Sequence, residues 1–156
     1  MSYSYKHTQT SYMMLIVMLA VLVLFARLHM MARAELPSED AGTNLLVTSI
    51  MVAILLVLTS FVWLHVWIDD AYLRIKFGKG IFQKKFLLND IVSATRVKNH
   101  RWYGRGIRVW FWPYMWIYNV AGLDAVEIKL KSGRIYRIGT DEPEKLAQAI
   151  LSKLKK

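Results

Sequence analysis

The sequence predicts two membrane-spanning helices followed by an α+β domain of short antiparallel strands that ends in one helix. Three observations support this fold class. Two long stretches without charged side chains occupy much of the first 68 residues, the hydrophobic pattern then changes to a period of two, and an amphipathic helical pattern ends the chain. The chain is 55% hydrophobic over 156 residues, so it needs a large core or a membrane to cover this surface.

Both apolar stretches are candidates for crossing a bilayer. Residues 12–26 contain no charged side chain, and residues 45–68 contain none over 24 positions. About 20 helical residues cross the hydrocarbon core, so the second stretch is long enough by itself. The first stretch reaches this length if Arg27 and His29 extend to the interface while their neighbours stay in lipid. We therefore predict two transmembrane helices that form a hairpin.

These helices divide the chain into five predicted segments. An even number of crossings places both termini on one side, and 18 of the 21 Lys and Arg residues follow Ile68. The basic residues directly after the second helix favour a cytoplasmic domain. The segments are a short cytoplasmic tail (1–11), transmembrane helix 1 (12–32), an external loop (33–44), transmembrane helix 2 (45–68) and a cytoplasmic domain (69–156).

A cleaved signal peptide is the alternative interpretation of the first stretch. It requires a basic start, a short apolar segment and a cleavage site of small residues. Only Lys6 precedes the stretch, and residues 30–34 (MMARA) are a poor cleavage site. The sequence therefore favours an uncleaved helix.

The charge is concentrated in the predicted domain. Residues 69–156 contain 18 basic and eight acidic side chains, which accounts for the whole net charge of +10. Such a domain is attracted to an anionic leaflet or an acidic partner. The chain has no cysteine, which excludes disulfides, thiolate catalysis and zinc sites built from cysteine.

After Asp70 the sequence alternates in the manner of half-buried strands. Leu73, Ile75 and Phe77 alternate with polar neighbours, and a Gly-Lys-Gly turn at 78–80 begins a hairpin. Similar alternation and turn signals continue for about sixty residues. The seven expected strands are 72–77, 81–87, 91–97, 107–111, 115–120, 126–130 and 134–138.

The last expected element is an amphipathic helix. Asp141 and Glu144 have the spacing of a capping box, and Pro143 suits the first turn. The apolar stripe consists of Leu146, Ala147, Ile150, Leu151 and Leu154. Seven antiparallel strands and a final helix are the element order of a pleckstrin-homology-type (PH-like) antiparallel β-barrel. We therefore predict such a barrel with a C-terminal capping helix.

Three ordered motifs add a family resemblance. They are WYGRGIR at 102–108, YNVAG at 118–122 with AVEI at 125–128, and IGTDEP at 138–143. With these motifs the chain resembles bacterial membrane-anchored PH-like proteins of unassigned function, over residues 70–154. The resemblance implies a location in the bacterial cytoplasmic (inner) membrane and no enzymatic activity. The chain departs from the family where Arg105 replaces a frequent Gly-Trp pair and where residues 110–114 are unusually aromatic.

The aromatic segment is the first candidate site. The interior of one barrel cannot accept side chains from both faces of a strand, so some of these rings must lie outside it. They are predicted to form an interfacial anchor or a docking surface for another membrane subunit. In the alternative interpretation one face fills the core and the other packs on the transmembrane hairpin. The candidate docking residues are Trp110, Phe111, Trp112, Tyr114 and Trp116.

Basic side chains form the second candidate site, for anionic headgroups or an acidic partner. One group lies just before the aromatic segment, and the other lies on the first hairpin, where PH domains of similar fold hold inositol phosphates. The alternative is a solvated, solubilising surface. The two groups are Lys98, Arg101, Arg105 and Arg108, and Lys79, Lys84 and Lys85.

Signals for catalysis and metal binding are weak. No Ser–His–acid order, phosphate loop or catalytic carboxylate pair can be assembled, and the four histidines are scattered. His65 and Asp69, four apart on an expected helix, could form half of a metal or proton site, but an interfacial pair is the simpler interpretation. We therefore expect no catalytic residues, no metal and no cofactor.

The sequence therefore predicts a non-enzymatic membrane-anchored interaction module. It would be an accessory or scaffolding subunit that docks on a larger membrane protein complex at the inner leaflet. The alternative is an anionic-lipid-binding or lipid-sensing domain. Expected partners are the membrane, anionic phospholipids, and another membrane protein or a second copy of the chain. A basic aromatic sheet also suits nucleic acid in composition, but not beside a membrane hairpin, so none is expected.

Overall fold

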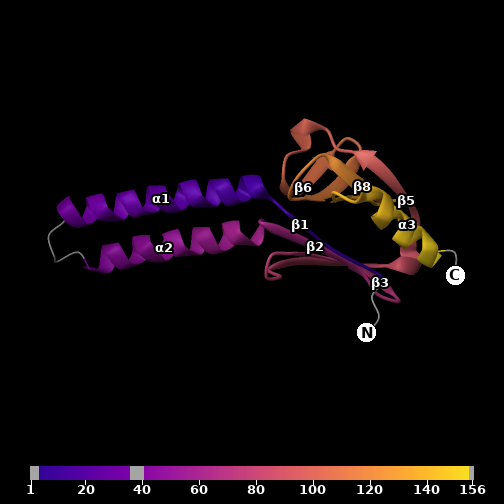
Figure 1. Cartoon of the computed structure of the whole chain (residues 1–156), viewed down its shortest axis with the longest axis horizontal. Coiled ribbons are helices and arrows are strands. Elements are labelled where there is room, and N and C mark those ends of the chain that lie inside the picture. Colours follow the sequence, from indigo (N-terminus) through magenta and orange to yellow (C-terminus); the bar gives the residue numbers. More distant parts are fainter. Residues whose placement is uncertain (1–3, 36–40, 155–156) are drawn as a thin grey trace.

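The computed structural model describes residues 4–35 and 41–154. Within these ranges the chain is α+β, as predicted, with three α-helices and two sheets (Figure 1). The elements are β1 (Tyr5–Thr10), α1 (Tyr12–Glu35), α2 (Ala41–Ser60), β2 (Trp63–Ile68), β3 (Tyr72–Phe77), β4 (Phe82–Leu87), β5 (Ile91–Lys98), β6 (Gly106–Phe111), β7 (Tyr114–Asn119), β8 (Asp124–Leu130), β9 (Ile135–Gly139) and α3 (Pro143–Leu154), with short 3₁₀ turns at Leu88–Asp90 and Arg101–Tyr103.

Helices α1 and α2 lie side by side and project from one end of the β domain (Figure 1). Ser11 caps α1, because its Oγ accepts a hydrogen bond of 3.3 Å from the N–H of Met14. Residues Tyr12–Met31 are long and apolar enough to cross a membrane, and none of this segment is buried within the protein. Among the described residues α1 is the one helix that meets this criterion, since the apolar part of α2, Leu45–Ser60, is shorter.

The predicted second helix is wrong at its C-terminal end. It was expected to reach residue 68, but α2 ends at Ser60 and residues Trp63–Ile68 form strand β2. Leu64, Val66 and Ile68 are buried while the residues between them are more exposed, which is the period of a strand. An apolar run without charges has the same composition in a buried strand and in a helix. Hydrophobicity alone therefore did not show that residues 63–68 form a strand and not the end of the helix.

The predicted N-terminal tail is also different, because residues Tyr5–Thr10 form strand β1. This strand pairs antiparallel with β2, and Thr10 lies opposite Trp63. The first sheet has the order β1-β2-β3-β4. The strand before α1 and the strand after α2 are therefore hydrogen-bonded neighbours. The predicted boundary at residue 69 moves accordingly, since the domain includes both of these strands.

The seven predicted strands are all present, as β3 to β9. The last five form a second sheet with the order β5-β8-β9-β7-β6, in which β7 pairs parallel with β9. The two sheets do not close into the predicted barrel. Strand β4 ends one sheet and β6 ends the other, and no ladder joins them in the described part of the chain. The side chains of Phe61, Phe82 and Ile107 line a cavity that also involves residues of β4 and β7.

The core lies between the sheets and α3. Helix α3 packs on β5 and β8 and buries Leu146, Ala147 and Ile150. The predicted capping box does not form, because Asp141 bonds to His7 and Glu144 pairs with Arg96. The Thr140 hydroxyl instead accepts a hydrogen bond of 3.1 Å from the N–H of Glu142. The His7 contact, 2.5 Å long, connects β1 to the start of α3.

Candidate functional site

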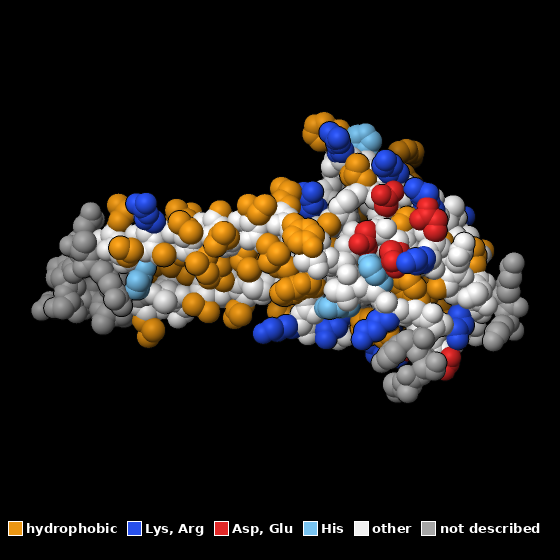
Figure 2. Space-filling model, in the orientation of Figure 1, with side chains coloured by type: hydrophobic (Ala, Val, Ile, Leu, Met, Phe, Trp, Pro, Cys, Tyr) orange, Lys and Arg blue, Asp and Glu red, His pale blue; other side chains and the backbone are white. Residues whose placement is uncertain are grey.

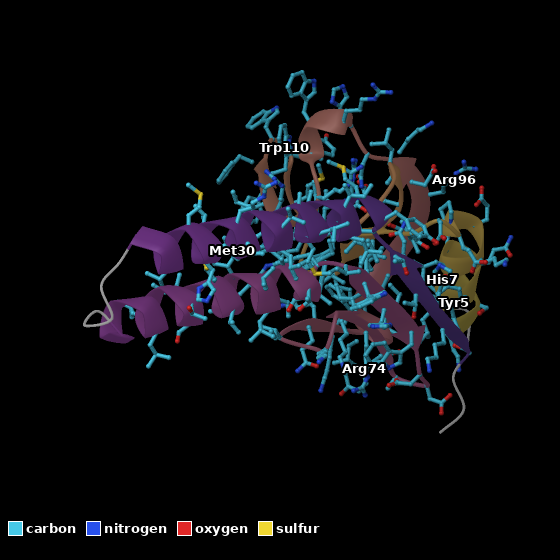
Figure 3. All side chains as sticks on the ribbon, turned by 60° about the vertical axis from the view of Figure 1, so that its left-hand side comes forward. Tyr5, His7, Met30, Arg74, Arg96 and Trp110 are labelled. Carbon is cyan, nitrogen blue, oxygen red and sulfur yellow. The ribbon has the colours of Figure 1, made fainter. Side chains whose placement is uncertain are left out.

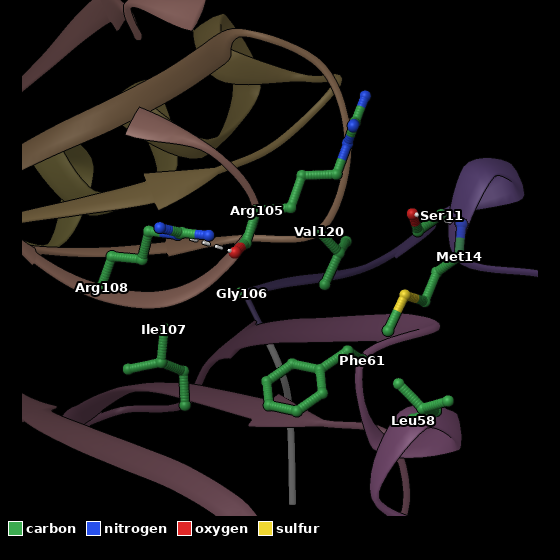
Figure 4. Close-up of a pocket in the computed structure, with 9 residues that line it drawn as sticks. All are labelled: Ser11, Met14, Leu58, Phe61, Arg105, Gly106, Ile107, Arg108 and Val120. Atoms are coloured by element: carbon green, nitrogen blue, oxygen red, sulfur yellow. Dashed lines mark hydrogen bonds between the residues drawn. The ribbon is translucent and has the colours of Figure 1, made fainter. Parts of the chain in front are cut away.

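A cavity of about 460 Å³ lies where the helical hairpin meets the β domain (Figure 4). We call it the junction cavity. One part of its wall comes from the helix ends and the other from the start of β6 and the residue after β7. The lining residues are Ser11, Met14, Leu58, Phe61, Arg105, Gly106, Ile107, Arg108 and Val120.

Backbone contacts fix the β3–β4 turn beside the end of α2. The N–H of Gly78, in the β3–β4 turn, donates a hydrogen bond of 2.8 Å to the carbonyl of Trp63. A Cβ at Gly78 would lie 2.8 Å from the Cα of Ser60, and its φ of 49° lies in the left-handed region. Glycine is therefore needed here for two reasons. The contact holds the β3–β4 turn, with exposed Lys79, against the end of α2.

Two arginines form the polar side of the junction cavity. Arg105 places Nη1 2.7 Å from the sulfur of Met13, and Arg108 donates from Nε to the carbonyl oxygen of Arg105 at 3.2 Å. Both side chains are exposed. Within residues 4–35 and 41–154 no acidic side chain pairs with either guanidinium. The cavity therefore combines an apolar wall with two positive charges that have no counterion from the described residues.

A second cavity, of about 650 Å³, lies between strand β4 and strands β6 and β7. We call it the edge cavity. It shares Phe61 and Ile107 with the junction cavity, so the two meet at these side chains. Its other lining residues are Ile75, Phe77, Ile81, Phe82, Gln83, Lys84, Trp116 and Tyr118. The gap between the two open sheet edges is thus a largely apolar groove that begins at the base of the helices.

Aromatic rings stabilise the walls of this groove. Phe61 stacks on Phe82 with ring centroids 5.4 Å apart, and it meets Phe77 in an edge-on arrangement at 5.8 Å. Trp116 stacks on Tyr118 at 6.4 Å. Burial raises the pKa of Tyr118 to about 12, with a smaller contribution from neighbouring Tyr136, so this hydroxyl is neutral at physiological pH.

The five predicted docking aromatics separate into two groups. Phe111, Trp112 and Tyr114 are 77%, 91% and 54% exposed in the β6–β7 hairpin, and we call them the aromatic tip. Trp110 is half-buried: its Nε1 donates to the carbonyl of Trp112 at 2.9 Å, and its ring lies 4.7 Å from that of Tyr103. Trp116 packs on the core. The expectation that some rings lie outside the core is confirmed.

The predicted basic residues do not form one patch. On the face shown in Figure 2 Lys and Arg side chains lie at several separate places on the domain, while the helices show mainly hydrophobic side chains. Arg101 and Arg105 line a separate cavity of about 320 Å³, whereas Lys85 lies in register with Arg74. Figure 3 places Arg74 on the opposite side of the domain from Trp110. All seven are exposed, and three line the two cavities described above: Arg105, Arg108 and Lys84.

The proposed His65–Asp69 half-site does not form, because His65 lies in a strand. His65 Nδ1 lies 2.8 Å from the hydroxyl of Thr8, and burial, with nearby Lys76 and Lys6, lowers the pKa of its ring. Burial opposes ionisation of Asp69, but other contacts outweigh it and lower the pKa of this carboxyl. These are the N–H groups of Ala71 and Tyr72 and the Arg74 guanidinium at 2.8 Å.

Sequence reasoning missed several residues of the site. Met14, Leu58 and Phe61 were assigned to the membrane helices, and nothing in a linear sequence connects them to Arg105. Trp102 is 81% exposed and was noted only as part of a motif, although a tryptophan between Arg101 and Tyr103 in a glycine-rich loop is a usable signal.

Comparison with known proteins adds no assignment to this geometry. No protein-family model matches the chain, and no curated protein is significantly similar to it. The functional interpretation therefore rests on the residues and contacts described above.

Proposed function

We propose that this chain is a non-enzymatic, membrane-anchored interaction module with a PH-like domain at the cytoplasmic face of the bacterial inner membrane. It acts as an accessory or scaffolding subunit that docks on a larger membrane protein complex. The observation that supports docking best is the exposure of the aromatic tip: three large rings in one hairpin lie outside any core. Clustered exposed aromatic side chains are typical of interaction surfaces, where Trp and Tyr dominate the binding energy.

Pairing of β1 with β2 supports a two-span anchor. If α1 crosses the bilayer, the chain must return, because β1 before it and β2 after α2 belong to the same sheet. The 20 residues of α2 give a total length of about 30 Å, of which Leu45–Ser60 is the apolar part. Most large apolar side chains of both helices are exposed in the described segments, so lipid or a partner helix must cover them.

The distribution of charge supports the cytoplasmic orientation. The basic residues of the described chain lie mainly on the domain, and Lys79 is next to the end of α2. Positive charge close to a membrane-spanning segment favours the cytoplasmic side. The PH-like assignment is supported by seven strands and a final helix in the predicted order, with β1 and β2 as additions at the start.

The docking function is tested with the full chain purified in mild detergent from its own cells. Serine replaces the aromatic tip in the triple variant Phe111→Ser, Trp112→Ser, Tyr114→Ser. We expect the domain to stay folded and a stoichiometric membrane-protein partner to be lost. The matched control is Leu87→Ser with Val92→Ser, which removes exposed apolar side chains elsewhere on the domain. A triple variant that keeps its partner would refute docking through the tip.

A second candidate function is binding of anionic lipid. The specific observation in its favour is the junction cavity, where Arg105 and Arg108 lie beside apolar helix ends without an acidic partner among the described side chains. A lipid function and a docking function use different surfaces, since neither cavity includes a residue of the aromatic tip. They are therefore separable by mutation.

A further inference from the structure

We infer that the groove formed by the junction cavity and the edge cavity binds one anionic phospholipid from the cytoplasmic leaflet. Arg105 and Arg108 contact its phosphate, and one acyl chain lies between β4 and β6. This inference rests on the membrane anchoring of the proposed function, and it deepens the second candidate function by assigning the phosphate and one acyl chain to named residues. Of the first-hairpin lysines, Lys84 lines the edge cavity, whereas Lys79 and Lys85 line neither cavity.

The position of the groove is the first argument. Met14 is the third residue of α1 and Leu58 is the third from the end of α2, so the wall of the junction cavity continues the lipid-facing surface of the helices. A hairpin that spans the bilayer places these residues at the boundary between hydrocarbon and headgroups. A phospholipid beside the hairpin therefore has its phosphate at the depth of this cavity.

Charge is the second argument. Both arginines line the junction cavity: Arg108 Nε bonds to the backbone carbonyl of Arg105, while the Arg105 side chain extends in another direction (Figure 4), and neither guanidinium is paired with a carboxylate in the described part of the chain. Among the described residues the Arg105 side chain donates to the sulfur of Met13, a weak acceptor that a phosphate oxygen readily replaces. Guanidinium groups bind phosphate with two parallel hydrogen bonds. The two arginines thus match an anionic headgroup in charge.

The open sheet edges are the third argument. Because β4 and β6 are not hydrogen-bonded to each other, a chain enters between them without breaking any ladder. The walls inside are Ile75, Phe77, Phe82, Ile107, Trp116 and Tyr118. The volumes of about 460 and 650 Å³ are in the range of small-molecule sites, roughly 300–1,000 Å³. An apolar groove with two cations at its membrane end suits a lipid better than a soluble anion.

The test uses the full chain in bilayer nanodiscs of phosphatidylcholine and phosphatidylglycerol in equal parts, released into mild detergent for native mass spectrometry. We expect wild type to retain one phosphatidylglycerol. The double variant Arg105→Ala, Arg108→Ala should retain it about tenfold less, since bonds to charged groups are the strong ones. The control is Lys131→Ala with Arg134→Ala, which removes the same charge from exposed residues that line neither cavity and should retain lipid as wild type does.

A further variant tests the acyl-chain site with both arginines intact. Gln83 is exposed on β4 and lines the edge cavity, so Gln83→Trp fills the groove at little cost to folding. We expect it to lose the lipid as well. Equal retention by wild type and the arginine variant, or equal loss in the Lys131 and Arg134 control, would overturn the inference. Single-cysteine versions of the same proteins, labelled in intact cells, separate the two proposals: with the two-span topology intact, absent lipid refutes the groove alone.

Discussion

The backbone N–H of Ser11 donates a hydrogen bond of 2.8 Å to the carbonyl oxygen of Val62. Ser11 directly precedes α1 and Val62 follows α2, so this bond joins the two ends of the helical hairpin at the point where they enter the sheet. The β1–β2 ladder continues from it along six residue pairs. The helices and the first sheet therefore form one continuous antiparallel structure, and the domain is held close to whatever surrounds the helices.

This connection predicts the membrane topology. The chain contains no cysteine, so single cysteines at Ser4, Ser38 and Ser132 give unambiguous labelling sites. A membrane-impermeant maleimide on intact cells should label Ser38→Cys, while Ser4→Cys and Ser132→Cys should react only after permeabilisation. Opposite sides for Ser4 and Ser132 would contradict the pairing of β1 with β2 across a two-span anchor.

Burial under α3 predicts different effects of aspartate substitution at two neighbouring aliphatic residues, Ile150 and Leu151. Ile150 is fully buried, whereas Leu151 is 38% exposed. Ile150→Asp should unfold the domain, because an unpaired buried charge costs several kcal/mol, about as much as the total stability of many domains. Leu151→Asp should cost less than about 1 kcal/mol. Chemical denaturation followed by tryptophan fluorescence measures both, and equal losses would mean that α3 packs differently.

Exposure of the aromatic tip predicts a contrast within one hairpin. Trp112→Ser should change the free energy of unfolding by about 0.5 kcal/mol or less, since its side chain is almost fully exposed. Tyr118→Ala should cost about 3 kcal/mol or more, because this ring is buried against Phe77 and Tyr136. Thermal unfolding in detergent compares them. A large loss for Trp112→Ser would show that the tip is part of the core.

The lowered pKa of Asp69 predicts a pH dependence of stability. Its carboxyl titrates below the ordinary value of 3.8 in the folded chain, so the ionised form is favoured by folding. The resulting stability is fully present above the unfolded pKa and is lost as pH falls through the folded pKa. Asp69→Asn should remove this part of the acid dependence. Asp70→Asn changes a highly exposed carboxylate and should leave the acid dependence of stability unchanged. Denaturation curves measured from pH 6 to pH 2 compare the two variants.

Close packing at Gly78 predicts a difference between two glycines of similar backbone conformation. Both Gly78 and Gly133 have positive φ, but a Cβ at Gly78 meets the backbone of Ser60 while one at Gly133 meets nothing within 4 Å. Gly133→Ala should cost about 1 kcal/mol from backbone strain alone. Gly78→Ala should cost clearly more, because the β3–β4 turn must move away from α2. Equal costs would mean that this contact is not rigid.

The sequence by itself determined the elements whose signal is local. Leu73, Ile75 and Phe77 alternate with polar residues in β3, and the same alternation with turn residues between the runs located all strands from β3 to β9. The spacing of Leu146 and Ile150 located α3 in the same way. The excess of rings in residues 110–116 was also a local signal, because one strand cannot bury both of its faces.

Local signals left some elements undecided, and only the tertiary structure determined them. The run from Trp63 to Ile68 is a strand because it lies between β1 and β3, and β1 itself, a polar segment, is a strand because it pairs with that run. The candidate site has the same origin. Arg105 and Arg108 were visible in the sequence, but Leu58 and Phe61 join them through contacts between residues more than forty positions apart. The side chains that share a cavity are set by sheet pairing, which no single stretch of sequence encodes.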